Sequence, residues 1–263
     1  MASKITIPDL KKIRVTDPLF SHYADMVAKK MIPVQWEILN GKQGQSRCFC
    51  IDNFRIAGGT LQGEHRGVVF GDTDAYKWLE AVAYCANNGE TEYISQADEL
   101  IEIIGQAQQP DGYLNTYFTV CHPELRWKNL TEGHELYSAG HLIEAAVAYY
   151  NATGKRRLLD IAAKFADLIC QTFGDGEGQI PGYPGHQEIE LALVKLWRVT
   201  GEERYLKTAR FFLDCRGRTP NYLLREMNDP NHKVIFPELR NYDPSYSQSH
   251  VCPVEQKTME GHA

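Results

Sequence analysis

Three stretches of the chain share one pattern of apolar and polar positions. They span residues 78–104, 139–169 and 189–214. In each, an apolar segment ends at a glycine, and a charged turn then opens a second segment with apolar residues at i, i+3, i+4 and i+7. Gly89, Gly154 and Gly201 occupy this place, where a helix can end in a left-handed residue. The pattern predicts three hairpins, each made of two helices.

The two helices of each hairpin differ in character. The first is apolar around most of its circumference, whereas the second has a charged face, so we expect an inner layer of helices covered by an outer one. The spacing is irregular, with 64 residues from Glu80 to Glu144 but 47 from Gly154 to Gly201. This irregularity favours part of a closed (α/α)6 toroid over a regular solenoid.

The remaining segments complete an all-α prediction. We expect a short extended N-terminal segment, a helix over residues 18–40 and an extended excursion over 219–249. Cys48 and Cys50 alternate with apolar residues, which indicates an extended segment whose thiols pack rather than bind metal. The seven cysteines are an odd number, which favours reduced thiols over a disulfide framework.

Composition narrows the function classes. The chain of 263 residues is 43% hydrophobic and 24% charged, with a net charge of -6, so a nucleic acid partner is not expected. No window approaches the roughly 20 apolar residues that span a bilayer, and the first residues lack a signal-peptide core. We therefore expect no membrane association and a cytoplasmic location.

Four loops beside the predicted helices combine glycine or proline with acidic, histidine and aromatic residues. They cover residues 70–78, 108–116, 132–141 and 182–190. Such a mixture suits carbohydrate, because aromatic rings pack on sugar C–H faces and polar side chains pair with hydroxyls. The residues from these loops that could contact a substrate include Asp72, Asp74, Tyr113 and Glu188. For the two aspartates, simply capping the helix that contains Trp78 is the favoured interpretation.

The histidines give the sharper hypothesis. His134 and His186 each follow a glycine and precede an inner helix, and His262 follows a third glycine near the end of the sequence. We expect these three to converge at one rim of the helical ring and bind a ligand. His141 lies within an apolar helix and is expected to pack. It is about 10.5 Å of helix rise from His134, which excludes a zinc-protease pair. No metal site is expected.

Glu188 and a second glutamate, Glu190, are candidates for acid or base chemistry, since carboxylate pairs drive glycoside hydrolysis. They are two residues apart at the start of a helix and therefore point to different faces. They cannot form a facing pair.

Six segments carry a resemblance to a known family. They read IPVQWEIL, FGDTDAYKWLEAVAY, AQQPDGYLNTYF, HELYSAGHLIEAAVAYY, GYPGHQEIELALVKLW and EGHA. In this order they resemble the N-terminal catalytic region of the β-L-arabinofuranosidase-like glycoside hydrolases, from about residue 15 to residue 263. The resemblance implies an (α/α)6 barrel followed by β-domains, and release of terminal L-arabinofuranose with retention from an oligosaccharide or glycoconjugate. It places sugar contacts at His134, His186 and His262.

The same resemblance implies chemistry that this sequence lacks. In the family, a cysteine thiolate held on zinc by other cysteines and a glutamate is the nucleophile, and another glutamate is the acid/base. Their E-x-C and Cys-Cys patterns do not occur in the 263 residues. We therefore expect residues 1–263 to be an incomplete N-terminal portion of the catalytic domain, inactive alone, without its own zinc ligands, and able to self-associate or pair with a missing half.

Two other functions are compatible with the same patterns. One keeps the toroid but uses histidine or aspartate without zinc, as in a sugar 2-epimerase or an unsaturated uronyl hydrolase. The other is a helical-repeat scaffold that binds protein partners without catalysis.

Overall fold

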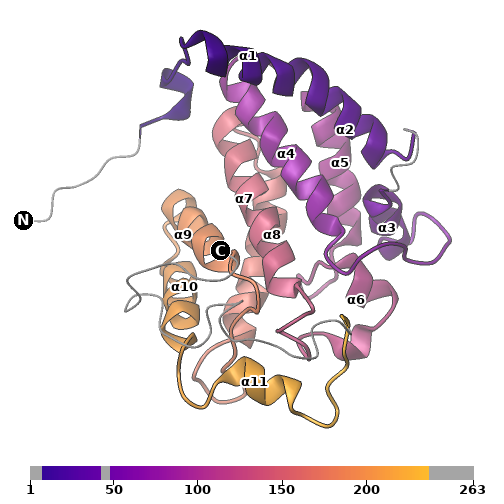
Figure 1. Cartoon of the computed structure of the whole chain (residues 1–263), viewed down its shortest axis with the longest axis vertical. Helices are drawn as coiled ribbons and strands as arrows, with labels where there is room; N and C mark the ends of the chain where they lie inside the picture. The colour runs from indigo at the N-terminus through magenta and orange to yellow at the C-terminus, as the bar shows by residue number, and fades with distance from the viewer. Residues whose placement is uncertain (1–7, 43–47, 237–263) are drawn as a thin grey trace, which may run out of the picture.

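The computed structural model describes residues 8–42 and 48–236, and these residues form a helical structure (Figure 1). The β-type pairing found among them is one isolated bridge between Phe173 and Ile180. The all-α prediction is confirmed. None of the helices in the described ranges is both long and apolar enough to cross a lipid bilayer.

The three predicted hairpins are present. They pair α4 (Asp72–Asn87) with α5 (Ile94–Ala107), α7 (Glu135–Thr153) with α8 (Arg157–Thr172), and α9 (Ile189–Thr200) with α10 (Glu203–Cys215). Gly154 and Gly201 end the first helices of the last two hairpins with φ of 76° and 77°, and Gly89 has φ of 98°. These left-handed conformations favour glycine, which explains its recurrence at this place.

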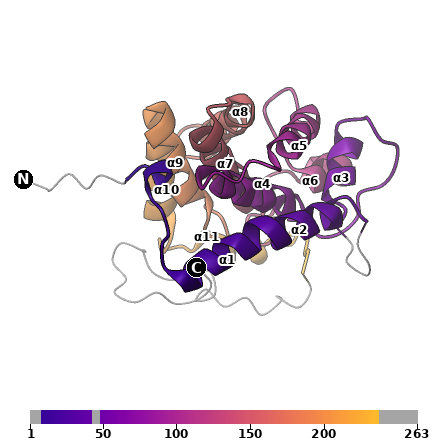
Figure 2. The same ribbon diagram turned by 90° about the horizontal axis from the view of Figure 1, so that it is seen from above.

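The hairpins stand side by side in two rows of helices (Figures 1 and 2). In one row α7 packs between α4 and α9, and in the other α8 packs between α5 and α10. This arrangement of αα-hairpins is consistent with an (α/α)6 helical-repeat fold.

The middle of the inner row carries much of the core. Helix α7 buries residues around its whole circumference, from Leu136 and Ala139 to Val147 and Tyr149. At the edge of this row α9 is less covered, and Leu191 on it is 55% exposed. The expected contrast between a buried first helix and a solvent-facing second helix therefore holds best for α7.

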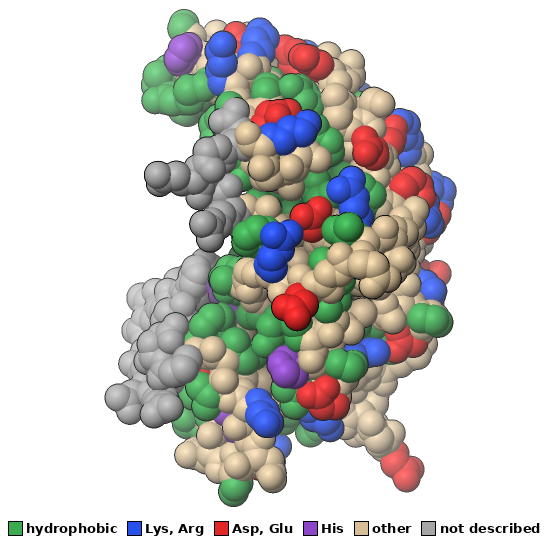
Figure 3. Space-filling model, turned by 90° about the vertical axis from the view of Figure 1, so that its right-hand side faces the viewer, with side chains coloured by type: hydrophobic (Ala, Val, Ile, Leu, Met, Phe, Trp, Pro, Cys, Tyr) green, Lys and Arg blue, Asp and Glu red, His purple; other side chains and the backbone are tan. Residues whose placement is uncertain are grey.

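The predicted N-terminal helix runs across one end of the inner row. It comprises α1 (Pro18–Met26), a π-helical stretch (Val27–Met31) and α2 (Ile32–Leu39). Helix α2 packs on α4, where Trp36 stacks on Trp78 with ring centroids 4.7 Å apart. Helix α1 buries no residue, and Figure 3 shows apolar side chains gathered at this end of the molecule.

Shorter helices complete the fold and correct two predictions. They are α3 (Cys50–Ala57), α6 (Thr116–Val120) and α11 (Tyr222–Met227), with 3-10 turns at Leu10–Lys12 and Pro123–Leu125. Cys50 begins a helix, not an extended segment, because Cys50, Ile51 and Phe54 together form its buried face. The excursion expected over 219–249 contains α11, whose Asn221 side chain accepts from Leu224 N. Beyond residue 236 that prediction falls outside the described residues.

Candidate functional site

Both described Gly-His pairs lie where two loops touch. A Cβ atom at Gly133 would lie 2.4 Å, and one at Gly185 2.2 Å, from a backbone oxygen of the turn 129–131. Both contacts are too short for any side chain. Gly133 therefore keeps its own turn tight, and Gly185 lets the loop that ends at His186 lie directly against that turn.

This contact brings two of the three predicted histidines together. The ring centroids of His134 and His186 are 5.9 Å apart. Tyr137 lies beside both, with its centroid 5.5 Å from His134 and 4.5 Å from His186. Tyr137 also lies beside the His141 ring, with centroids 4.5 Å apart. We call His134, Tyr137, His141 and His186 the histidine cluster. All four side chains are half-buried.

Backbone carbonyls fix the two loop imidazoles. Nδ1 of His134 lies 2.5 Å from the Glu132 carbonyl oxygen, and Nδ1 of His186 lies 3.1 Å from the Gln187 carbonyl oxygen. A carbonyl only accepts, so each Nδ1 carries the hydrogen in these contacts. His134 also has a left-handed backbone, with φ of 54° and ψ of 19°, at the position preceding α7.

Helix α4 and the turn before it supply the next contacts of the cluster. Lys77 Nζ donates to the Tyr137 hydroxyl at 3.0 Å, and the Phe70 ring lies 5.0 Å from the His134 ring. The cavity enclosed between His134 and His186 measures only about 10 Å³. That volume suits about one water. A larger ligand would have to bind over the exposed edges of the rings.

The carboxyl group of Glu188 lies beside the histidine cluster. Glu188 Oε1 is 3.4 Å from His141 Nδ1. Burial, together with the carboxylates of Glu144 and Glu80, raises the pKa of Glu188 to about 7. Burial and the nearby Lys77 charge lower the pKa of His141 to about 4. At neutral pH, His141 is therefore uncharged, and Glu188 is near its midpoint of protonation.

The Glu190 side chain points away from the histidine cluster, as its spacing of two residues from Glu188 indicates. Its Oε1 lies 3.6 Å from Arg216 Nη2, and Arg216 is completely buried. The same Nη2 donates to the Pro184 carbonyl at 2.6 Å. Glu190 thus neutralises a buried cation that supports the loop before His186, and it is not at the exposed edge of the cluster.

The two candidate aspartates have structural contacts. Asp72 is 2% exposed, and its carboxylate accepts from the backbone N–H and the hydroxyl of Thr116 at 2.8 and 2.5 Å. Burial raises the pKa of Asp72 to about 6. Asp74 is exposed, and its Oδ2 lies 3.6 Å from Cys48 Sγ. Asp72 therefore joins the start of α4 to the start of α6 and presents no surface to a ligand.

Tyr113 lies in the core, not at the surface. It is 0% exposed, and its hydroxyl donates to Glu135 Oε1 at 2.5 Å. Glu135 Oε2 accepts from Trp127 N at 2.8 Å, and burial raises the pKa of Glu135 to about 8. Because Glu135 directly follows His134, Tyr113 holds the start of α7 from inside and cannot touch a bound substrate.

The third predicted histidine, His262, lies outside the described residues. Within the described ranges, no three His, Cys, Asp or Glu side chains are grouped so that they could hold a metal ion. Among the described residues, the side chains therefore do not form a zinc site of the kind that the family resemblance implies.

Sequence reasoning missed Tyr137 and Lys77 and assigned His141 to packing. Tyr137 and His141 follow His134 by three and seven residues, a spacing that places all three on one helix face. This signal was available in the sequence. Lys77 gave none, because only the packing of α4 against α7 brings it to Tyr137.

Comparisons with known proteins agree on one family. The family described as β-L-arabinofuranosidase, GH127 catalytic domain, matches residues 12–263. A non-reducing end β-L-arabinofuranosidase of Bifidobacterium longum subsp. longum is 37% identical over 269 aligned positions, which cover 95% of this chain and 41% of the relative.

Solved structures show the same likeness. Ara127N-Se, a GH127 β-L-arabinofuranosidase from Geobacillus stearothermophilus T6, matches with a TM-score of 0.86 and 52% identity, over 93% of this chain and 38% of that one. A second GH127 β-arabinofuranosidase matches with a TM-score of 0.77 and 34% identity, over 94% and 36% of the two chains. The chain spans about two fifths of the length of these relatives. It belongs to the GH127 β-L-arabinofuranosidase family of glycoside hydrolases.

Proposed function

We propose that this chain forms the sugar-binding part of a glycoside hydrolase that releases terminal L-arabinofuranose with retention. The observation that carries the proposal is the histidine cluster, in which two Gly-His loops and one helix bring three imidazoles and a phenol together. Their flat rings suit the C–H face of a sugar, and their nitrogen and oxygen atoms suit its hydroxyls.

The identity of the sugar rests on the family. The relative from Bifidobacterium longum is named for a β-L-arabinofuranose at a non-reducing end. We infer that the cluster holds such a terminal residue of an oligosaccharide or glycoconjugate. His134 and His186 are the principal contacts in this proposal, Tyr137 lies between them, and His262 joins them in the expectation drawn from sequence.

The proposed role of these residues is to position the sugar. The zinc-bound thiolate and the acid/base glutamate implied by the resemblance have no counterpart in the sequence patterns of this chain, and the described side chains do not group as zinc ligands. No chemical step is therefore assigned to its residues. Correct orientation of a bound sugar can still lower a reaction barrier by about 7–11 kcal/mol when the reacting groups are well aligned.

Titration calorimetry with L-arabinose tests this role. We expect His186→Ala to weaken binding at least about tenfold, or about 1.4 kcal/mol, because it removes one face of the cluster. His22→Ala is the matched control, since His22 is exposed on α1. Equal affinity of the wild type and the His186→Ala variant would contradict the proposed role.

A further inference from the structure

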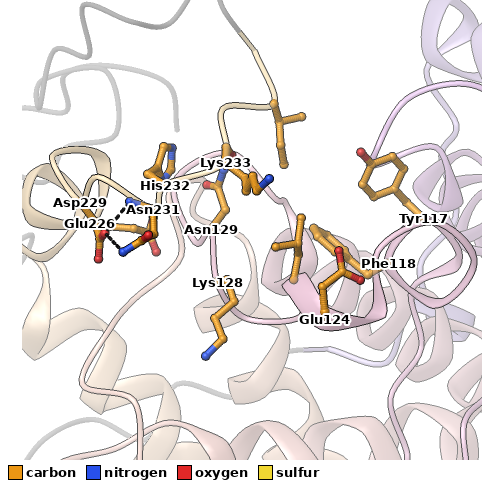
Figure 4. A pocket seen from close by; sticks show the side chains of 12 residues that line it. Tyr117, Phe118, Glu124, Lys128, Asn129, Glu226, Asp229, Asn231, His232 and Lys233 are labelled. Carbon is orange, nitrogen blue, oxygen red and sulfur yellow. Dashed lines mark hydrogen bonds between the residues drawn. The ribbon is translucent and has the colours of Figure 1, made fainter.

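A second cavity lies beyond the turn that leads to the histidine cluster. It measures about 320 Å³ and is enclosed by residues 117–129 on one side and by the end of α11 and residues 229–235 on the other (Figure 4). Asn129 lines this cavity, whereas His134, at the other end of the same turn, belongs to the cluster. No function has so far been given to this space.

Hydrogen bonds tie the two walls together. The Glu226 carboxylate accepts from the backbone N–H groups of Leu130 and Thr131, each at 2.8 Å. Asn129 Nδ2 donates to the carbonyl oxygen of Lys233 at 2.7 Å. These contacts join segments about a hundred residues apart in sequence, so the cavity is held open by the fold itself.

The inside of the cavity is mainly apolar, with a flat aromatic ring. Phe118, Leu125 and Ile235 line it together with Tyr117. The Tyr117 ring is held edge-on to Phe118, with centroids 5.2 Å apart at 88°, and lies 5.8 Å from His122. A fixed, half-exposed tyrosine of this kind can stack on the C–H face of a sugar.

The polar groups of the cavity carry both signs of charge. Lys128 and Lys233 supply ammonium groups, and Glu124 and Asp229 supply carboxylates; all four are exposed, and the Glu226 carboxylate also lines the cavity (Figure 4). They can therefore donate to and accept from hydroxyl groups. The balance favours a neutral polyol over a strongly anionic or cationic ligand.

His232 supplies a buried polar group in the same wall. Its side chain is 4% exposed, and its Nε2 lies 3.5 Å from Glu132 Oε2. Nδ1 has no hydrogen-bond partner among the described residues. Burying an imidazole nitrogen without a partner costs free energy that a hydrogen-bonding ligand would recover.

We propose that this cavity is a subsite for a neutral sugar ring, an inner unit of the glycan whose terminal L-arabinofuranose binds the histidine cluster. The inference rests on the function proposed above for the cluster. The cavity volume, the fixed Tyr117 ring, the two-signed rim and the buried His232 together match one sugar ring stacked on an aromatic face.

Binding of arabino-oligosaccharides to the 263-residue chain tests the subsite. Calorimetry would compare L-arabinose with linear arabino-oligosaccharides of increasing length. We expect affinity to rise about tenfold once the oligosaccharide reaches the cavity, since a second ring is then bound. In Tyr117→Ala this gain should disappear while affinity for L-arabinose stays within about twofold, because Tyr117 is not part of the cluster.

Two further variants distinguish a lost contact from misfolding of the chain. Lys128→Ala changes only an exposed rim residue and should reduce the gain about threefold. Tyr23→Ala, an exposed tyrosine on α1, should leave the gain unchanged. The subsite would be refuted if affinity did not rise with length, if Tyr117→Ala kept the full gain, or if oligogalacturonate bound in place of the neutral oligosaccharides.

The two proposals fail in different ways. If His186→Ala bound every oligosaccharide as the wild type does while Tyr117→Ala lost them, the role of the cluster would be wrong and a sugar site in the cavity would be supported. If His186→Ala weakened binding of oligosaccharides of every length and Tyr117→Ala weakened none, the role of the cluster would be supported and the subsite rejected.

Discussion

His134 has a left-handed backbone that an L-residue adopts at a cost. Its φ of 54° places it among the two non-glycine residues with positive φ in the described ranges, the other being Trp127. Such strain costs about 1–2 kcal/mol and tends to persist where the surrounding structure requires it. Here it allows the chain to turn from residue 133 directly into α7 while the imidazole stays beside His186.

The cost of this conformation can be measured by comparing two variants. His134→Ala and His134→Gly both remove the ring, but only glycine adopts this φ without strain. We therefore expect the glycine variant to be more stable than the alanine variant by about 1 kcal/mol in urea denaturation. Both should bind L-arabinose weakly. Equal stability of the two variants would show that no strain is present.

Glu188 should make stability depend on pH. Its pKa is raised to about 7 in the folded chain from an ordinary value of 4.5, mainly by burial. The folded state thus holds this proton more tightly than the unfolded state. The contribution is fully present below pH 4.5 and is lost as pH rises through 7. The wild type should therefore lose stability relative to Glu188→Gln between pH 5 and pH 8.

Thermal melts of both proteins across this range would check the effect. Asp72 and Glu135 also have raised pKa values, so the difference between variant and wild type is the quantity that reports on Glu188. Glu177→Gln, which changes an exposed carboxyl, is the control. A difference in melting temperature that stays constant from pH 5 to pH 8 would contradict the prediction.

At the residue scale, the sequence allowed part of the site to be predicted. The Gly-His pairs could be recognised because the same pair recurs before two predicted inner helices; the close backbone contacts of Gly133 and Gly185 became visible only in the structure. Asp72 and Tyr113 come from loops of the same composition yet are buried. Composition cannot separate them from His186, because exposure depends on how the loops pack on one another.

At the scale of elements, one glycine sets the distance between two inner helices. A Cβ at Gly140 in α7 would lie 2.5 Å from Glu188 Cγ and 3.0 Å from the backbone N of Ile189. Only glycine lets the start of α9 come this close to α7. The same contact places Glu188 beside His141, so helix packing and site geometry share one cause.

Alanine at two helical glycines should therefore have opposite effects. Gly140→Ala should cost about 1–3 kcal/mol, because backbone atoms of α9 must move. Gly105→Ala in α5 meets chiefly the flexible end of Arg157 and should be neutral or stabilising by up to about 1 kcal/mol, since alanine favours the helix. Chemical denaturation of both variants measures this. A Gly140→Ala variant as stable as Gly105→Ala would contradict the close packing.

The long elements were easier to predict than the short ones. Apolar spacing and the glycine ends defined α7 and α9, because a helix of three or more turns repeats its pattern several times. Helices α3 and α11 have eight and six residues, so their periodicity is too short to read. Cys48 and Cys50 looked like alternating strand positions for this reason.

At the scale of the whole molecule, burial is unevenly distributed. Helix α7 packs against α4, α8 and α9 and lies at the centre of both the core and the histidine cluster. Helix α1 buries no residue, and its Phe20 is 63% exposed. The strained backbone of His134 and the half-buried Glu188, whose pKa is raised, both lie against α7, the helix with the most packing around it. This packing can hold both groups in unfavourable states.

Hydrogen exchange should reveal this gradient within the 263-residue chain. Amides in α7 can exchange only when helices on three sides separate, so their protection should approach that of global unfolding. Amides in α1 are held by their own helix alone and should exchange at least about a hundredfold faster. Helix α8, which is packed on one face, should fall between them. Equal protection of α1 and α7 by mass spectrometry would mean that α1 is covered as firmly as the core.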